Sequence, residues 1–137
     1  MPLGRRVSKD VAELYEADQA LAGVYRDRLA AASRAESDLR DAQARGEADI
    51  RALATAFDAA LTEAVLAAEA SERVAMGTKT YATDAQDAKT RRAAEIARRA
   101  AKAKPHVRPW TDEVDRLRTA REAHRLSFRA GGRRAVA

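Results

Sequence analysis

Large apolar side chains recur at helical spacing through residues 8–76, a stretch that contains no proline. Residues three or four apart share one face of an α-helix, so this spacing predicts helix over the whole stretch. The apolar stripe consists of Leu14, Leu21, Tyr25, Leu29, Leu39, Ile50, Leu53, Phe57 and Leu61. The chain also holds 35 alanines against 28 larger apolar residues. Because alanine favours helix but buries little surface, we expect an elongated all-α fold with a modest core.

Gly46 is the one obvious interruption of this helical region, and it leaves two interpretations open. If a helix ends there, the next helix folds back and forms an antiparallel hairpin. If the helix continues, Leu39 and Ile50 stay in phase, because eleven residues make close to three turns. We expect the continuous, coiled-coil-like helix, with the hairpin as the alternative. A lone helix of that length needs partners to bury its apolar stripe, so it predicts a homo-oligomer.

Residues that cap or break helices mark the next segments of the chain. The sequence GTKTYA, residues 77–82, interrupts the helical pattern and is interpreted as a linker. Thr83 and Gln86 have the spacing of a capping box, which predicts a basic amphipathic helix over 83–104. This helix is expected to stop before Pro105, since a proline disfavours helical geometry in the residue that precedes it.

The C-terminal part of the chain predicts one more basic helix. Residues 105–110, PHVRPW, are interpreted as a stiff linker bounded by two prolines. Thr111 can cap a second, arginine-striped helix over 111–130. A glycine pair is expected to end that helix and to open a basic tail, 131–137. Residues 1–7 form a short basic arm at the other end of the chain.

Charge is distributed unevenly along the sequence. Residues 1–88 carry 11 Lys and Arg against 16 Asp and Glu, whereas residues 89–137 carry 15 against 5. The first part therefore has a balance of −5 and the second a balance of +10, which together give the net charge of +5. Such asymmetry indicates a structural portion followed by a cationic portion that meets something anionic.

Both C-terminal helices place their basic residues on one face. At 100° per residue, the charged residues of the first lie in one sector about 120° wide, opposite a face of alanines and Ile96. The candidates for binding an anionic partner are Arg91, Arg92, Arg98, Arg99 and Lys102 on the first helix, and Arg118, Arg121, Arg125 and Arg129 on the second. The planar fork of arginine suits both phosphate and carboxylate groups.

Three interpretations of these basic faces remain open. They are solvated surfaces, grips for nucleic-acid phosphates, or docking faces for an acidic protein, including the acidic stretches of a neighbouring copy. Aromatic residues that could stack on single-stranded bases are almost absent. Trp110 is expected to pack over the start of the last helix instead.

The sequence contains no recognisable active site, so we expect a protein that is not an enzyme and uses neither a cofactor nor a metal. Cysteine is absent, and His106 and His124 are expected to be packed or surface residues rather than ligands. No apolar run approaches the roughly 20 residues of a membrane span, and no secretory signal is present. A cytoplasmic protein, or one within a virion-like assembly, is the expectation.

The function expected from these features is that of a structural or assembly protein, such as a virion component, scaffold or adaptor. It would oligomerise through its alanine-rich helices and dock its basic C-terminal helices on an anionic partner. The alternative is a nucleic-acid-binding accessory protein that dimerises through the long helix and clamps DNA or RNA phosphates with residues 89–134. The expected partners are protein subunits, of its own kind or others, and in the alternative DNA or RNA, but not a membrane.

Overall fold

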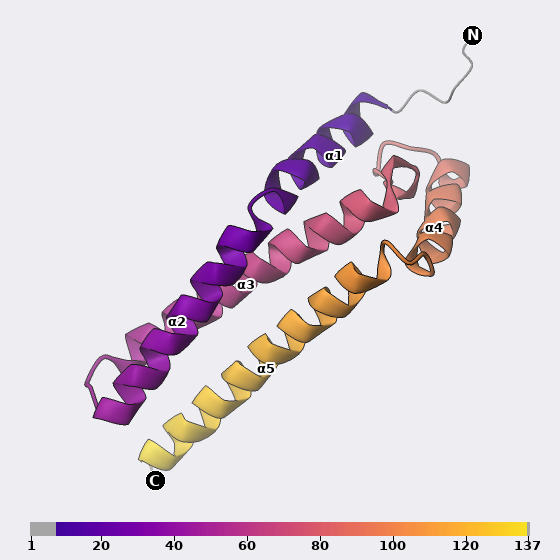
Figure 1. Ribbon diagram of the computed structural model, residues 1–137. Helices are drawn as coiled ribbons and strands as arrows, with labels where there is room; N and C mark the ends of the chain where they lie inside the picture. The colour runs from indigo at the N-terminus through magenta and orange to yellow at the C-terminus, as the bar shows by residue number, and fades with distance from the viewer. Residues whose placement is uncertain (1–7, 137) are drawn as a thin grey trace.

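The computed structural model describes the backbone of residues 8–136 and the side chains of residues 8–129, and over this range the chain is all-helical (Figure 1). The all-α class predicted from the sequence is therefore confirmed. The predicted basic arm, residues 1–7, lies outside the described residues. The helices are α1 (Lys9–Ala22), α2 (Tyr25–Arg45), α3 (Ile50–Met76), the short 3-10 helix η1 (Thr78–Thr80), α4 (Ala88–Lys102) and α5 (Arg108–Val136).

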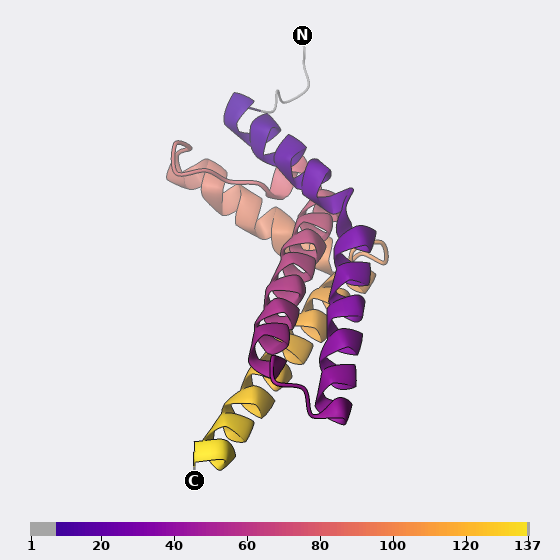
Figure 2. The ribbon, with the colours of Figure 1, turned by 90° about the vertical axis from the view of Figure 1, so that its left-hand side faces the viewer.

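Helix α3 is the centre of the fold, because α1, α2 and α5 all pack along it (Figure 1). Helix α4 lies across the end of α3 and contacts mainly η1 (Figure 2). The main core is formed by α2, α3 and α5 and contains Ala32, Leu39, Ala54, Phe57, Leu61, Ala64, Val65, Ala68, Val114 and Leu117. Many of these side chains are alanines, which lets the helix backbones approach closely. The result is the thin, elongated core that the composition implies.

The helix ends at Gly46, so the prediction of a continuous helix over residues 8–76 is wrong. Gly46 has φ +67° and ψ 34°, a left-handed conformation that glycine adopts without a Cβ clash. Its N–H donates to the carbonyl of Gln43, and the N–H of Glu47 donates to the carbonyl of Ala42. This is the hydrogen-bond pattern of a Schellman motif, which closes the end of α2 and sends α3 back along it.

Most of the apolar stripe is covered within this one chain. Leu39, Phe57 and Leu61 are buried, and the partly buried Tyr25, Leu29, Ile50 and Leu53 pack against the same core. Leu21 is half-buried, and Leu14 is 45 % exposed. The apolar residues on either side of Gly46 face the same core, because α2 and α3 pack against each other along their apolar faces.

A second interruption, which the sequence analysis did not predict, lies at Gly23. Helix α1 ends at Ala22 and α2 begins at Tyr25, and Figure 2 shows the two helix axes at an angle. Gly23 itself keeps right-handed helical angles, and Val24 departs from them with φ −104° and ψ 9°. The break is therefore a bend within the N-terminal helical arm rather than a reversal.

The helix starts differ from those predicted. Helix α4 begins at Ala88 instead of residue 83, because the carboxylate of Asp87 accepts the N–H of Thr90 at 2.7 Å and caps it. Thr83 and Gln86 form only half of the expected capping box. The Gln86 side chain accepts the Thr83 N–H at 3.0 Å, but the Thr83 hydroxyl has no partner.

Helix α5 is longer than predicted at both ends. It begins at Arg108 instead of residue 111, and it includes Pro109 in its first turn, where proline is tolerated because no N–H is needed. It also continues to Val136, so the expected end at Gly131 and Gly132 and the separate tail over 131–136 are wrong. Glycine only weakens a helix, by about 1 kcal/mol, and does not by itself end one.

Candidate anion-binding surface

The arginine row of α5 is directed largely at α3 of the same chain. Arg125 binds Asp58 through two hydrogen bonds of 2.7 and 3.1 Å. Arg118 donates to Glu69, and Arg121 donates to the Thr62 hydroxyl at 3.4 Å. Arg129 is exposed. Three of the four candidates on α5 therefore help to hold α5 against α3.

These pairs make an antiparallel ladder between the two helices. The Thr111 hydroxyl donates to Glu72 at 2.6 Å near the start of α5. Further along α5, a ring nitrogen of His124 is hydrogen-bonded to the carbonyl of Ala54 at 2.9 Å. The hydrogen bond from Arg125 lowers the pKa of Asp58, which keeps this carboxylate ionised beside the guanidinium. The sequence analysis missed the ladder because it counted the acids of residues 1–88 only in a charge balance and not by position. Their helical spacing over residues 58–72 was the available signal.

Aromatic residues also join α5 to the rest of the fold. Trp110 packs edge-on against Tyr25 of α2, with the ring centroids 5.0 Å apart, and the Tyr25 hydroxyl donates to Glu113. Trp110 was expected to pack over the start of the last helix, but it lies inside the first turn of α5 and packs on α2 instead. The His124 ring packs edge-on against Phe57 and stacks with Phe128. The ring of the other histidine, His106, is bonded to the carbonyl of Ala75 at 2.9 Å.

Helix α4 differs from α5 because only one edge of it is covered. Ala94 and Ala101 are buried and Ala97 is half-buried, whereas Ile96 is 62 % exposed. The sequence analysis placed Ile96 on the alanine face, opposite the charged residues, but the contact of α4 with η1 and α3 is too narrow to cover it. All five candidates on α4 are exposed: Arg91, Arg92, Arg98, Arg99 and Lys102.

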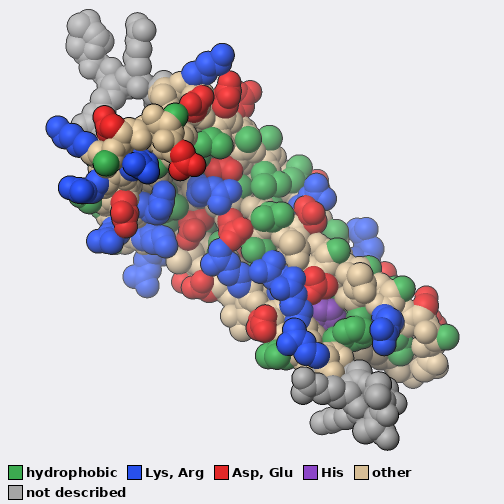
Figure 3. Space-filling model, turned by 180° about the vertical axis from the view of Figure 1, so that it is seen from behind, with side chains coloured by type: hydrophobic (Ala, Val, Ile, Leu, Met, Phe, Trp, Pro, Cys, Tyr) green, Lys and Arg blue, Asp and Glu red, His purple; other side chains and the backbone are tan. Residues whose placement is uncertain are grey.

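The outward basic face of α4 is formed by Lys89, Arg91, Arg92, Arg99 and Lys102. Lys and Arg side chains crowd at this end of the molecule in Figure 3, whereas over α5 they alternate with Asp and Glu. The ion pair that the described side chains form on α4 joins Arg99 to Glu95 at 3.3 Å. Both partners are largely exposed, so this pair contributes little to stability and leaves the face cationic.

Arg98 has a different role from the other candidates because it fastens α4 to the short helix η1. Its Nη2 donates to the carbonyl of Thr80 at 3.1 Å. Arg98 also lines an open cavity of about 490 Å³ between α1, α3 and α4, and Lys102, at the border of the outward basic face, lines the same cavity. Residues from all three helices therefore meet beside the inner edge of α4.

Asp18 is the polar centre of that cavity. It accepts two hydrogen bonds from Arg73, at 2.8 and 3.0 Å, and one of 2.5 Å from the Tyr81 hydroxyl. Burial by itself would raise the pKa of Asp18, but the hydrogen bonds from Arg73 and Tyr81 outweigh it and hold that pKa below its usual value of 3.8. Burial raises the pKa of Tyr81, and the bond to the Asp18 carboxylate raises it further. The network ties α1 to α3 and to the loop before α4.

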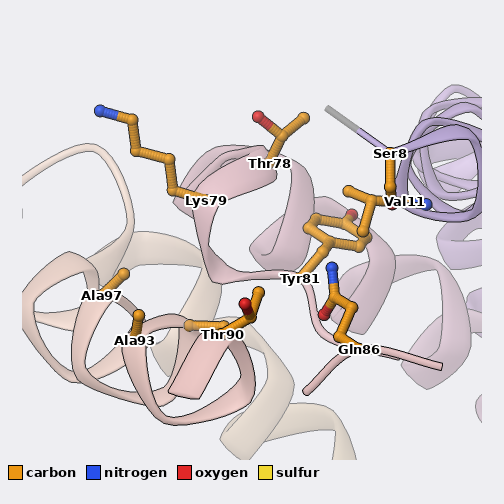
Figure 4. Close-up of a pocket in the computed structure, with 10 residues that line it drawn as sticks. Ser8, Val11, Thr78, Lys79, Tyr81, Gln86, Thr90, Ala93 and Ala97 are labelled. Atoms are coloured by element: carbon orange, nitrogen blue, oxygen red, sulfur yellow. Dashed lines mark hydrogen bonds between the residues drawn. The ribbon is translucent and has the colours of Figure 1, made fainter. Parts of the chain in front are cut away.

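A second groove, of about 250 Å³, separates α4 from the first turn of α1 (Figure 4). Val11, Tyr81 and Gln86 lie on one side of it, and Ala93 and Ala97 of α4 lie on the other. The alanine side of α4 therefore borders a groove along part of its length rather than another helix. Along this part of its length α4 is not packed against the body formed by α1, α2, α3 and α5, which we call the rod.

No protein-family model matches the chain, and comparison with curated proteins and with solved structures finds no significant match. Within residues 8–129, no group of three or more His, Asp or Glu side chains is placed to hold a metal ion. The helices that the structure describes include none that is both long enough and apolar enough to cross a membrane.

Proposed function

We propose that this protein is a non-enzymatic helical assembly or adaptor protein that binds an anionic macromolecule through the outward basic face of α4. The observation that supports this proposal is the contrast between the two basic helices. Arg118, Arg121 and Arg125 of α5 bind side chains of α3, two of them through carboxylates. The outward basic face of α4 is instead exposed, with Glu95 as the one acid beside it.

The rod serves in this proposal as the support for α4. Residues of α2, α3 and α5 bury one another's apolar side chains, and Arg98 together with two buried alanines fixes α4 at the end of the rod. A charged face on a fixed helix loses less conformational freedom on binding than the same residues on a mobile loop. The rod is also what an assembly component or adaptor needs in order to hold its binding face away from its own body.

The sequence predicted a homo-oligomer, but the proposed function does not require obligate self-association. The reason for expecting it was an apolar stripe without a partner, and α3 and α5 supply that partner within one chain. The partner bound by α4 is therefore proposed to be a different molecule rather than a second copy.

Retention on a heparin column tests this proposal, because heparin is a dense polyanion. The test variant is Arg92→Gln with Arg99→Gln, two exposed residues of the outward basic face. The control is Arg34→Gln with Arg51→Gln, which removes the same charge from exposed sites on α2 and α3. We expect the unaltered protein and the control to elute at similar salt, and the α4 variant to elute at clearly lower salt, because retention depends on local cations and not on net charge.

Thermal unfolding of the three proteins should agree within a few degrees, since substitutions of exposed side chains rarely change stability by more than about 0.5 kcal/mol. Co-elution of the α4 variant with the control would contradict the proposal. So would the absence of retention at low salt for the unaltered protein.

A further inference from the structure

We propose, building on the function proposed above, that the anionic partner is the phosphodiester backbone of a nucleic-acid duplex, bound without base readout. The site is the outward basic face of α4, with Arg92 and Arg99 at its middle. Three sets of observations carry this inference: the geometry of the face, the side chains that it lacks, and the charge of the rest of the chain.

The geometry of α4 presents its cations to one straight partner. Arg92 lies about 180° around the helix from the buried Ala101, so it points away from the rod. From Lys89 to Lys102 the face extends about 20 Å at 1.5 Å per residue. Phosphates of one DNA strand are about 3.4 Å apart along the duplex axis, so a helix of this length spans several phosphate positions of a duplex. The five cations are distributed along the helix and can meet phosphates at more than one of these positions.

The side chains around these cations do not form the centre of a protein–protein interface. Ile96 is the only large apolar residue of α4, and the helix has no aromatic residue. A standard interface buries about 800 Å² on each partner around aromatic or bulky anchors, whereas interfaces with nucleic acid are polar and strongly positive. One isoleucine among alanines is also too little to embed a helix in a lipid surface. The face therefore fits a nucleic-acid backbone better than it fits an acidic protein.

The aromatic residues favour a duplex over a single strand. Proteins that bind single strands stack bases on exposed aromatic rings. Here the rings of Trp110 and Tyr25 pack against each other, as do those of Tyr15 and Tyr81. Phe128 stacks on His124, far along α5 from α4. Within the described residues, no aromatic ring adjoins the outward basic face, so phosphates are what remains for it to bind.

The charge of the rest of the chain sets the direction of approach. Helices α1, α2 and α3 together carry 8 Lys and Arg against 12 Asp and Glu, a balance of −4. Their field repels a polyanion, and the cations of α4 attract it. A duplex is therefore guided to the α4 end of the rod and away from its acidic sides.

Fluorescence anisotropy with labelled duplexes tests the inference on the full-length protein. The probes are a 20-base-pair DNA duplex of mixed sequence, an RNA duplex of the same sequence and a second DNA duplex of unrelated sequence. Labelled polyglutamate stands for an acidic protein partner. Each is titrated at several salt concentrations from about 50 to 200 mM, the range over which counterion release has a large effect.

The unaltered protein is expected to bind both DNA sequences equally. If all five cations contact phosphates, the slope of log affinity against log salt on DNA is about −4.5, since each contact contributes about −0.9. Arg92→Gln with Arg99→Gln should reduce the magnitude of that slope by about 2 and weaken binding by tens of fold near 0.1 M salt. Arg34→Gln with Arg51→Gln should leave both the slope and the affinity nearly unchanged.

Binding to either duplex with this dependence on α4 supports the inference, and the DNA and RNA probes show which source of phosphodiesters is preferred. Equal binding by the α4 variant and the control overturns it. Binding of polyglutamate without binding of either duplex also overturns it, and assigns the face to an acidic protein. In that last case, retention on heparin that still depends on α4 leaves the proposed function standing, so the two proposals can fail separately.

Discussion

A single carboxylate, that of Asp18, joins three separate segments of the chain. Arg73 reaches it from α3 and Tyr81 reaches it from the loop that leads to α4. The side chain of Asp18 is only 13 % exposed, so removing its charge leaves Arg73 and Tyr81 with a weaker, neutral acceptor in a largely covered place. This one residue therefore holds α1, α3 and the loop before α4 together by hydrogen bonds, whereas the buried alanines hold α4 by apolar contacts.

We predict that Asp18→Asn lowers the free energy of unfolding by about 1–2 kcal/mol at pH 7, because charged hydrogen bonds are lost. The native pKa of Asp18 is below its unfolded value, so its stabilising effect is complete at neutral pH. The effect disappears as the pH falls from about 4 through the lower native pKa, where the carboxylate becomes protonated. Urea unfolding of Asp18→Asn and of the unaltered protein, at pH 7 and in steps below pH 4, measures whether the difference between their free energies of unfolding decreases.

Asp38→Asn is the matched control for this prediction, since Asp38 is an exposed carboxylate on α2. It should unfold like the unaltered protein at both ends of the pH range. A difference between Asp18→Asn and the unaltered protein that stays constant down to pH 2 would contradict the assigned role of the Asp18 charge.

At the scale of the elements, two glycines that both interrupt helix have opposite backbone requirements. Gly46 needs a positive φ, and a Cβ added there would meet nothing within 4 Å. Any penalty for an alanine at this position is therefore backbone strain alone. Gly23 keeps right-handed angles, and an added Cβ would approach backbone oxygens of its own helix no closer than 3.4 Å.

We predict that Gly46→Ala lowers the free energy of unfolding by about 1 kcal/mol, because alanine is strained in the left-handed region. Gly23→Ala, its matched control, should cause no loss and a gain of up to about 0.5 kcal/mol, since it restricts the unfolded chain. Chemical denaturation of the three proteins provides the comparison. If the two variants shift stability in the same direction and by the same amount, the left-handed end of α2 is contradicted.

The elements also show where sequence reasoning worked. The all-α class followed from the apolar spacing. Gly46 was recognised as an interruption. The helical spacing of the apolar residues on its two sides could not decide between a turn and a continuous helix, because these residues face one core in either case. The capping box at Thr83 was misleading because Asp87 provides a better cap four residues later.

The candidate surface was predicted only in part, because pairing between distant segments cannot be read from one helix at a time. The arginine rows of α4 and α5 look alike in sequence. What distinguishes them is the row of acids on α3, which α5 lies against and α4 does not. Once the reversal at Gly46 places α3 in the middle, the acids at positions 58, 69 and 72 become partners for α5.

At the scale of the whole molecule, the covered apolar stripe has a consequence for size in solution. We predict that the 137-residue chain sediments as a monomer of 14.9 kDa with the high friction of an elongated particle. A single chain already provides the neighbours that its helices need, which removes the reason for an obligate dimer. Sedimentation velocity over a range of micromolar concentrations measures this. A species of twice the mass that persists on dilution would contradict the prediction.

Helix α3 ends close to where α5 begins, since Thr111 is hydrogen-bonded to Glu72 and His106 is hydrogen-bonded to the carbonyl of Ala75. The segment that carries α4 is therefore an excursion that leaves the rod and returns to almost the same point. An excursion of this kind can be exchanged, lengthened or lost while the two flanking helices keep their register. The rod and its charged helix are thus separable in evolution and in protein engineering: α4 could be transplanted onto another pair of antiparallel helices, and the rod could carry a different recognition helix in its place.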